Sequence, residues 1–174
     1  AQEIIIESEQ IAVEEIDQML VHVASSDKMK LLLGILKNEK PQSVIIFCNT
    51  KKSCEIVSKR LAMNGIESEF IIGDLPQAKR LQVLNSFKSG SLLCLVATDV
   101  AARGIDVQDL AMVINYDLPT ESENYVHRIG RTARAGKSGK AYTFCSEQDV
   151  YNLPAIERYL ETTIPATMAG EDMF

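Results

Sequence analysis

SVIIFCNT, residues 43–50, has a pattern from which the fold class of this chain can be inferred. Its apolar part, VIIFC, is rich in β-branched residues and has no polar interruption, which is typical of a strand buried on both faces of a sheet. Thr50 follows where a helix would begin, and its hydroxyl can cap a helix that carries Cys54, Val57 and Leu61 inward. A buried strand followed directly by a helix is the unit from which parallel α/β sheets are built.

The same unit recurs along the chain. Four further runs have the composition of strands: SEFII (68–72), LLCLVAT (92–98), LAMVINY (110–116) and KAYTFC (140–145). Helical spacing of apolar residues is found at residues 76–89, 121–133 and 147–161. Strands that alternate with crossover helices predict an α/β fold, with a doubly wound, mostly parallel sheet flanked by helices on both faces.

Ligands of such sheets bind at the carboxyl ends of the strands, so the residues that directly follow the predicted strands are candidates for a site. They are Asn49, Thr50, Gly73, Asp74, Thr98, Asp99 and Asp117. No one of these residues specifies a ligand by itself, because Asp and Thr at strand ends also cap helices.

Composition narrows the class of protein. The chain has 174 residues, of which 46% are hydrophobic and 24% charged, values that are ordinary for one globular domain. No apolar run approaches the length of a membrane span and the N-terminus is acidic, so we expect neither a signal peptide nor a membrane partner. The four cysteines have no CxxC spacing and there are only two histidines, so we expect no metal site and a reduced, cytoplasmic compartment.

The net charge of −6 is unevenly distributed along the sequence. Residues 1–17 contain six acidic residues and no Lys or Arg, whereas residues 125–146 contain five cations and no acid. Local fields, not the total charge, govern the attraction of a polyanion. The acidic composition therefore does not exclude RNA or ATP as a ligand.

The basic region contains the stretch YVHRIGRTARAGKSGK, residues 125–140. It ends in Gly-Lys-Ser, as a P-loop does, but Arg131 stands where a P-loop requires its first glycine, and no buried strand leads into it. The spacing instead places Arg128, Arg131 and Arg134 on neighbouring parts of one helical face. They form either a solvated basic helix or a set of arginines for phosphates that another element holds.

A second candidate is ATDVAARGIDV, residues 97–107. Arg103 and Asp106 could face a common ligand, and Gly104 allows the backbone a tight turn between them. The alternative for this stretch is a plain helix cap at the end of a strand, and the two readings are equally open from the residues alone.

A third candidate is LPQAKR, residues 75–80, which places Gln77 and Arg80 in one helical turn. The two side chains could meet one phosphate oxygen. An arginine in a first helical turn is more often simply solvated, so the stretch carries little weight by itself.

Taken together and in this order, these segments resemble the C-terminal half of the DEAD-box ATP-dependent RNA helicases, over about Lys28 to Pro165. ARGID and HRIGRTAR are the specific parts, and the histidine of the second favours DEAD-box over DEAH relatives. The resemblance implies a RecA-like domain over residues 27–165. Residues 1–26 would be an acidic lead or interdomain linker, and residues 166–174 a tail without periodic pattern.

The resemblance also implies a mechanism. In the family, ATP binds between two RecA-like domains, and the N-terminal one carries the P-loop and the Asp-Glu-Ala-Asp segment that holds Mg²⁺. This chain has neither of those motifs. By motif position, Arg131 and Arg134 would be arginine fingers on the γ-phosphate. Asp106 would accept hydrogen bonds from the ribose hydroxyls of ATP, with Arg103 and Gly104 beside it.

The same resemblance implies contacts with the sugar–phosphate backbone of RNA, which hold a strand without reading its sequence. The residues concerned are Asn49, Thr50, Gly73, Asp74, Gln77, Arg80 and Thr98. Asp99, His127 and Arg128 would couple this domain to the N-terminal one. YNLPAIERYL, followed by IP, is similar to bacterial helicases that associate with RNA-degrading machinery, which implies RNA-processing proteins as partners.

Two positions depart from the family pattern: Ala133 stands where the family usually has glycine, and Ile72 where many members have histidine. Neither removes a charged group from the predicted site.

Two other functions stay open from the residues: a docking module that hydrolyses nothing, and a self-contained NTPase. The second lacks a phosphate cradle and a carboxylate pair for Mg²⁺.

Overall fold

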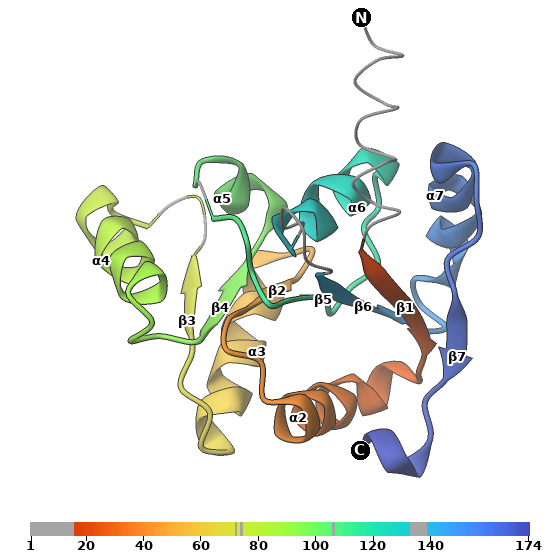
Figure 1. The fold of residues 1–174 in the computed structure, drawn as a ribbon, viewed down its shortest axis with the longest axis horizontal. Helices are drawn as coiled ribbons and strands as arrows, with labels where there is room; N and C mark the ends of the chain where they lie inside the picture. Colours follow the sequence, from red (N-terminus) through yellow and green to blue (C-terminus); the bar gives the residue numbers. More distant parts are fainter. Residues whose placement is uncertain (1–15, 72, 74, 106, 133–138) are drawn as a thin grey trace, which may run out of the picture.

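The computed structural model describes residues 16–71, 73, 75–105, 107–132 and 139–174. Its seven strands form one sheet in the order β3-β4-β2-β5-β6-β1-β7, and every pair of neighbours is parallel (Figure 1). The strands are β1 (Asp17–His22), β2 (Val44–Phe47), β3 (Glu69–Ile71), β4 (Cys94–Ala97), β5 (Met112–Asn115), β6 (Lys140–Cys145) and β7 (Ala166–Met168). The predicted α/β class is confirmed.

Helices cover both faces of the sheet. The α-helices are α2 (Lys28–Glu39), α3 (Lys51–Met63), α4 (Gln77–Lys88), α5 (Asp99–Arg103), α6 (Ser122–Ile129) and α7 (Leu153–Leu160). Short 3-10 turns are η1 (Ser25–Asp27), η2 (Gly130–Thr132), η3 (Val150–Asn152) and η4 (Glu171–Met173). Within the described chain, no helix combines the length and the apolar character that a bilayer crossing requires.

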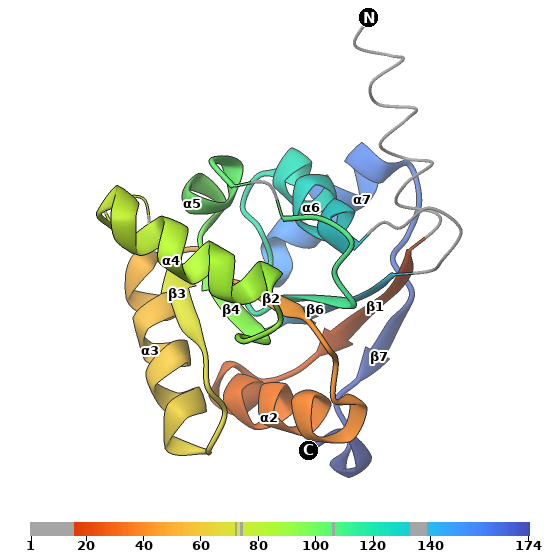
Figure 2. The same ribbon diagram turned by 60° about the vertical axis from the view of Figure 1, so that its left-hand side comes forward.

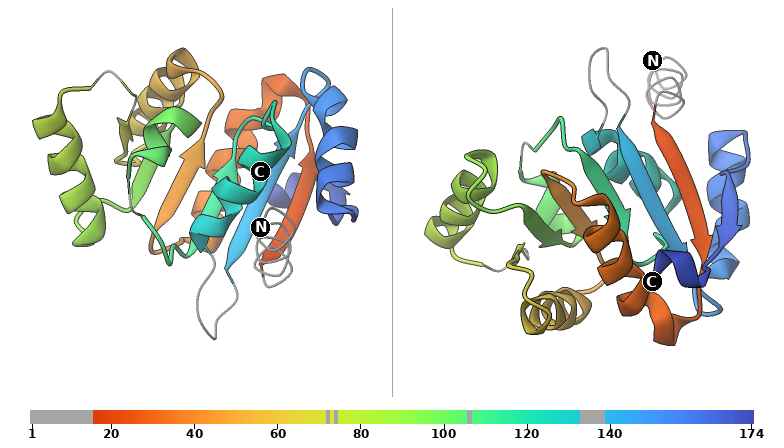
Figure 3. Two further views of the ribbon diagram at one scale, coloured as in Figure 1. Left: turned by 90° about the horizontal axis from the view of Figure 1, so that it is seen from above. Right: turned by 60° about the horizontal axis from the view of Figure 1, so that its bottom comes forward.

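Two apolar clusters form the core, one on each face. The cluster on one face joins the sheet to α4, α5, α6 and α7, and the other joins it to α2 and α3. Figure 2 shows α4 to α7 along one side with α2 on the other, and the right-hand view of Figure 3 shows α2 and α3 from below. Each strand of the sheet centre is buried on both faces, which explains the unbroken apolar runs of β2, β4 and β5.

Local signals set the limits of α3 and α4. The Thr50 hydroxyl accepts a hydrogen bond from the Ser53 amide at 3.1 Å and caps α3. Gly65, with φ of +79°, follows the end of that helix, and Gly90, with φ of +85°, follows α4. Pro76 directly precedes the first residue of α4. These residues fix where each strand–helix unit turns back.

Strands β1 and β7 are absent from the sequence prediction, although both lie in this sheet. β1, DQMLVH, mixes polar and apolar residues, and β7 is a three-residue edge strand with little side-chain burial. Its pairing with β1 depends on a contact between residues far apart in the chain, which no local pattern reveals. Residues 1–15 of the acidic lead lie outside the described residues.

Gly34, in the middle of α2, marks the place where the C-terminal segment packs on the domain. A Cβ built on Gly34 would lie 1.9 Å from the carbonyl oxygen of Met173. Met173 and Phe174 pack against the apolar cluster beneath α2, and Figure 1 shows the C-terminus beside that helix. The missing side chain at Gly34 therefore lets the C-terminal segment approach.

We predict that Gly34→Ala lowers the free energy of unfolding by about 1–3 kcal/mol, because the segment over α2 must move away. In a chain shortened to end at Gly170, the same substitution should instead stabilise by about 1 kcal/mol, since alanine is the better helix former. Urea denaturation of the four proteins measures both effects. Stabilisation by Gly34→Ala in both backgrounds would contradict the packing.

Candidate functional site

The carboxyl edge of the sheet is organised around Arg128, whose side chain is 1% exposed. Nε and Nη2 donate to the two carboxylate oxygens of Asp99, each at 2.7 Å. Nη2 also donates to Asn49 Oδ1 at 2.7 Å, and Nη1 donates to the Asp117 carbonyl at 2.8 Å and to Asn115 Oδ1 at 3.4 Å. The five N–H donors of the guanidinium thus meet five acceptors of this domain.

This arrangement follows from the cost of burying a charge. A guanidinium taken out of water needs a counter-ion and hydrogen bonds for its remaining donors. Asp99 supplies a two-pronged pairing, and the Phe47 ring lies 5.3 Å from the guanidinium carbon. Because the acceptors follow or end β2, β4 and β5, one side chain ties three strand ends together.

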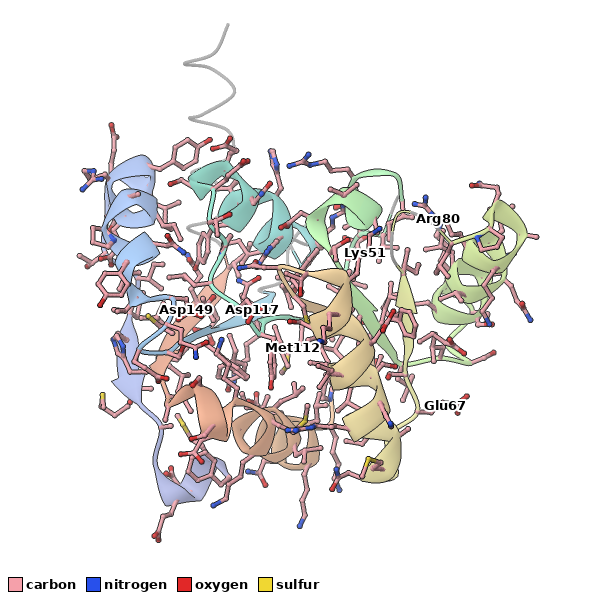
Figure 4. All side chains as sticks on the ribbon, turned by 180° about the vertical axis from the view of Figure 1, so that it is seen from behind. Lys51, Glu67, Arg80, Met112, Asp117 and Asp149 are labelled. Carbon is pink, nitrogen blue, oxygen red and sulfur yellow. The ribbon has the colours of Figure 1, made fainter. Side chains whose placement is uncertain are left out.

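Lys28, the first residue of α2, forms a second centre beside the first. Its ammonium lies 3.1 Å from Asp117 Oδ1 and 3.0 Å from Asp149 Oδ2. Figure 4 shows Asp117 and Asp149 next to each other, with Arg80 well apart on the side of α4. Burial alone lowers the pKa of Lys28, but the attraction of the two carboxylates outweighs it, so the pKa is raised above its ordinary value.

Arg131, three residues after Arg128, is half-buried and lies at the rim of the carboxyl edge, beside the end of α5. Nη2 donates to the Ala102 carbonyl at 2.7 Å, and Nη1 donates to the carbonyls of Ile105 at 2.8 Å and Val107 at 3.4 Å. The guanidinium therefore rests at the end of α5, on the carbonyls that flank position 106. The two other predicted nucleotide contacts, Asp106 and Arg134, lie outside the described residues.

Arg103 and Gly104 end α5 beside this arginine. Arg103 is exposed and its Nη2 donates to Asn124 Oδ1 at 2.9 Å. Gly104 has φ of −88°, which any residue adopts, so a turn requirement does not explain the glycine. A Cβ there would lie 3.0 Å from Arg80 Nη2, the end of a flexible side chain, which would have to move by a few tenths of an ångström.

Several of the predicted RNA contacts make hydrogen bonds within the domain. Thr50 caps α3 and the buried Thr98 caps α5, each through its hydroxyl. Arg80 donates to the Ala101 carbonyl at 3.1 Å, and Gln77, the first residue of α4, is exposed. Gly73 is an exposed turn residue; Asp74 lies outside the described residues.

Asn49 is tied into the domain on every side. Its backbone amide donates to Asp117 Oδ2 at 2.9 Å, its side-chain amide donates to the Leu118 carbonyl at 3.1 Å, and its side-chain oxygen accepts from Arg128. The structure therefore brings together Asn49, Asp99 and Arg128 of the predicted residues. His127, on the same helix as Arg128, is exposed.

Sequence reasoning missed Lys28, Asn115, Asn124 and Asp149 as members of this network. Each pairs with a partner far away in the chain; Lys28 and Asp149, for example, are 121 positions apart. The available signal was a polar residue at the edge of an apolar run, as Asn115 is at the end of β5. That signal does not name the partner.

Comparison with known proteins identifies relatives for both sequence and fold. Residues 27–136 match the family model described as helicase conserved C-terminal domain. The chain is 46% identical over 164 residues to the ATP-dependent RNA helicase RhlB of Vibrio vulnificus, covering 94% of this chain and 38% of that protein. It thus spans about two fifths of the length of this relative.

Solved structures share the fold, among them two with a bound partner molecule. One is the DEAD-box protein SrmB of E. coli bound to RraA, with a TM-score of 0.84, 34% identity and coverage of 91% of this chain and 93% of that chain. The other is S. cerevisiae Dbp5 bound to RNA and ADP BeF3, with a TM-score of 0.78, 34% identity and coverage of 88% and 41%.

We predict that Asp99→Ala lowers the free energy of unfolding by about 3–5 kcal/mol, because it leaves a buried guanidinium without its counter-ion. The double variant Asp99→Ala/Arg128→Met should cost less than the sum of the two single variants, since no charge is then stranded. Urea denaturation of the four proteins gives the coupling, with Glu67→Ala, an exposed carboxylate, as the control. Additive costs would contradict the pairing.

Proposed function

This chain belongs to the helicase conserved C-terminal domain family, among the DEAD-box RNA helicases, and from that membership we propose that it is the C-terminal half of an ATP-dependent RNA helicase. In this proposal, an N-terminal RecA-like domain of the same protein supplies the P-loop and the ligands of Mg²⁺. This half supplies arginine fingers and contacts to the RNA backbone. ATP hydrolysis then drives the remodelling of RNA.

The placement of Arg131 is the observation that carries the proposal. Its guanidinium lies at the rim on the carbonyls of Ile105 and Val107, directly on either side of Asp106 in the sequence. Arg103, His127 and Arg131 line one small hollow between α5 and α6. We therefore propose that Arg131 and Asp106, which lies outside the described residues, contribute to one ATP site.

Catalysis by such an arginine is electrostatic. Phosphoryl transfer spreads negative charge over the transferred group, and a planar guanidinium can contact two of its oxygens at once. An arginine finger typically contributes about 10³–10⁵-fold to the rate. A charged phosphate is a stronger acceptor for the Arg131 donors than the neutral carbonyls of Ala102, Ile105 and Val107, so ATP could recruit it. Arg134 would act beside it.

RNA is proposed to bind along the part of the carboxyl edge formed by the starts of α3 and α4. Thr50 and Gln77 stand at these helix N-termini, which attract phosphate groups. Arg80, Gly73, Asp74, Thr98 and Asn49 complete the proposed set. The relative Dbp5 has been solved with RNA, which supports this substrate class. Contacts of this kind hold the backbone without reading bases.

A docking function is the alternative, and one comparison favours it. The SrmB chain that is bound to RraA matches this chain over 93% of its length, so a domain of this kind suffices there to bind a protein. We propose RNA-processing proteins as partners here too, in the cytoplasm.

Sequencing the reading frame upstream of Ala1 discriminates between the two functions. A P-loop and a DEAD segment there support the helicase, and their absence supports docking alone.

We predict that the 174-residue chain alone shows negligible RNA-stimulated ATP hydrolysis, because it lacks the groups that hold the phosphates and Mg²⁺. A phosphate-release assay with saturating single-stranded RNA measures this, with the full-length parent as the positive control. Robust turnover by the pure chain would overturn the division of labour between the two domains.

In the full-length parent, Arg131→Ala should lower kcat by about 10³-fold while the dissociation constant for RNA changes little, because Arg131 contacts the transferred phosphate. Arg131→Lys should recover only part of the loss, since an ammonium keeps the charge but not the planar fork. Arg158→Ala, on the exposed face of α7, is the matched control. Equal losses in kcat and RNA affinity would refute the finger role.

A further inference from the structure

Lys28 is the most deeply buried lysine of the described chain, with 6% exposure, and the proposed chemistry assigns it no part. Its ammonium lies between the carboxylates of Asp117 and Asp149, at 3.1 and 3.0 Å. A buried cation of this kind costs stability unless its partners repay the desolvation. An apolar residue of similar size would fill the same space, so the charge calls for an explanation.

Both carboxylates are linked by hydrogen bonds to Asn49, in the turn between β2 and α3. The second oxygen of Asp117 accepts the backbone amide of Asn49 at 2.9 Å. Asp149 accepts the amide of Leu118 at 3.3 Å, and the carbonyl of Leu118 accepts the side-chain amide of Asn49 at 3.1 Å. Two short chains of hydrogen bonds thus run from Lys28 to the turn between β2 and α3.

That turn sets the start of α3. Asn49 is the residue before Thr50, whose hydroxyl accepts from Ser53 and caps the helix. Although Asn49 and Thr50 are exposed, the Asn49 backbone is held from below by Asp117 and its side chain by Arg128. Lys28 fixes Asp117 by charge, from α2 on the face of the sheet shared with α3. A shift of Asp117 would therefore release the Asn49 amide.

We propose that Lys28 is a positioning residue for RNA: through Asp117 and Asp149 it holds the Asn49–Thr50 turn in the geometry that receives the sugar–phosphate backbone, without touching RNA itself. The inference rests on the proposed RNA function of this turn. Lys28 is buried in the domain, so its proposed effect on RNA affinity is indirect.

The test uses the ¹⁵N-labelled 174-residue chain titrated with a short oligouridylate at low salt. Lys28→Met removes the cation, and Lys28→Gln, which keeps hydrogen-bond donors, is the milder variant if Lys28→Met does not fold. Lys37→Met, on the exposed side of α2, loses the same charge. Leu32→Ala, fully buried in α2, loses stability without touching the network.

We expect Lys28→Met to weaken oligouridylate binding about tenfold, the effect of losing one to two hydrogen bonds in the turn, and Lys28→Gln to weaken it less. Hydrogen exchange of the Asn49 amide should accelerate in both variants while the amides of β5 stay protected. Lys37→Met and Leu32→Ala should leave the Asn49 amide protected and RNA affinity within about twofold.

Two results would overturn the inference in different ways. If Leu32→Ala weakens RNA binding as much as Lys28→Met does, the effect is loss of stability and not positioning. If Lys28→Met exposes the Asn49 amide yet binds RNA normally, the turn is not an RNA contact through this route. Absence of any RNA-induced shift at Asn49 or Thr50 in the unaltered chain would overturn the proposed RNA site itself.

Discussion

The buried guanidinium of Arg128 must be neutralised within the domain, and this requirement organises the carboxyl edge of the sheet. Arg128 has almost no contact with water and needs an acceptor for each of its donors. Asp99, Asn49, Asn115 and Asp117 provide them from the ends of three parallel strands. The strand ends are therefore held in one register at the edge where α/β proteins bind ligands. The apolar core stabilises the sheet, and the Arg128–Asp99 ion pair organises the edge at which its strands end.

The helix that carries Arg128 gives two arginines different environments. Arg128 belongs to α6 and points into the domain, whereas Arg131 follows in the 3-10 turn η2 and lies at the rim. A step of three residues turns a side chain to a neighbouring face. The first arginine is saturated by its own domain, so a direct bond to another domain would require this network to open. The second donates to the backbone carbonyls of Ala102, Ile105 and Val107.

Much of the fold could be predicted from sequence, because β2, β4 and β5 are continuous apolar runs and Thr50 marks the start of α3. β1 and β7 could not, since their membership of the sheet depends on pairing across the chain. For the site, strand ends identified Asn49 and Asp99 in advance. The contacts of Lys28 were not predictable, because nothing local distinguishes a lysine that starts a helix from one paired to Asp117, 89 positions away. Helical phase alone also did not reveal that Arg128 is buried and Arg131 is not.

We propose that Arg128 organises the carboxyl edge of the sheet and that Arg131 contacts the phosphates of ATP there. The side-chain ¹⁵Nε resonances of the two arginines, recorded in the full-length protein before and after addition of RNA, ADP and beryllium fluoride, distinguish these roles. We predict a large shift for Arg131, as its carbonyl partners are exchanged for phosphate-like oxygens or fluorines, and an unchanged, exchange-protected resonance for Arg128. A shift of the Arg128 resonance with an unmoved Arg131 resonance would refute both roles.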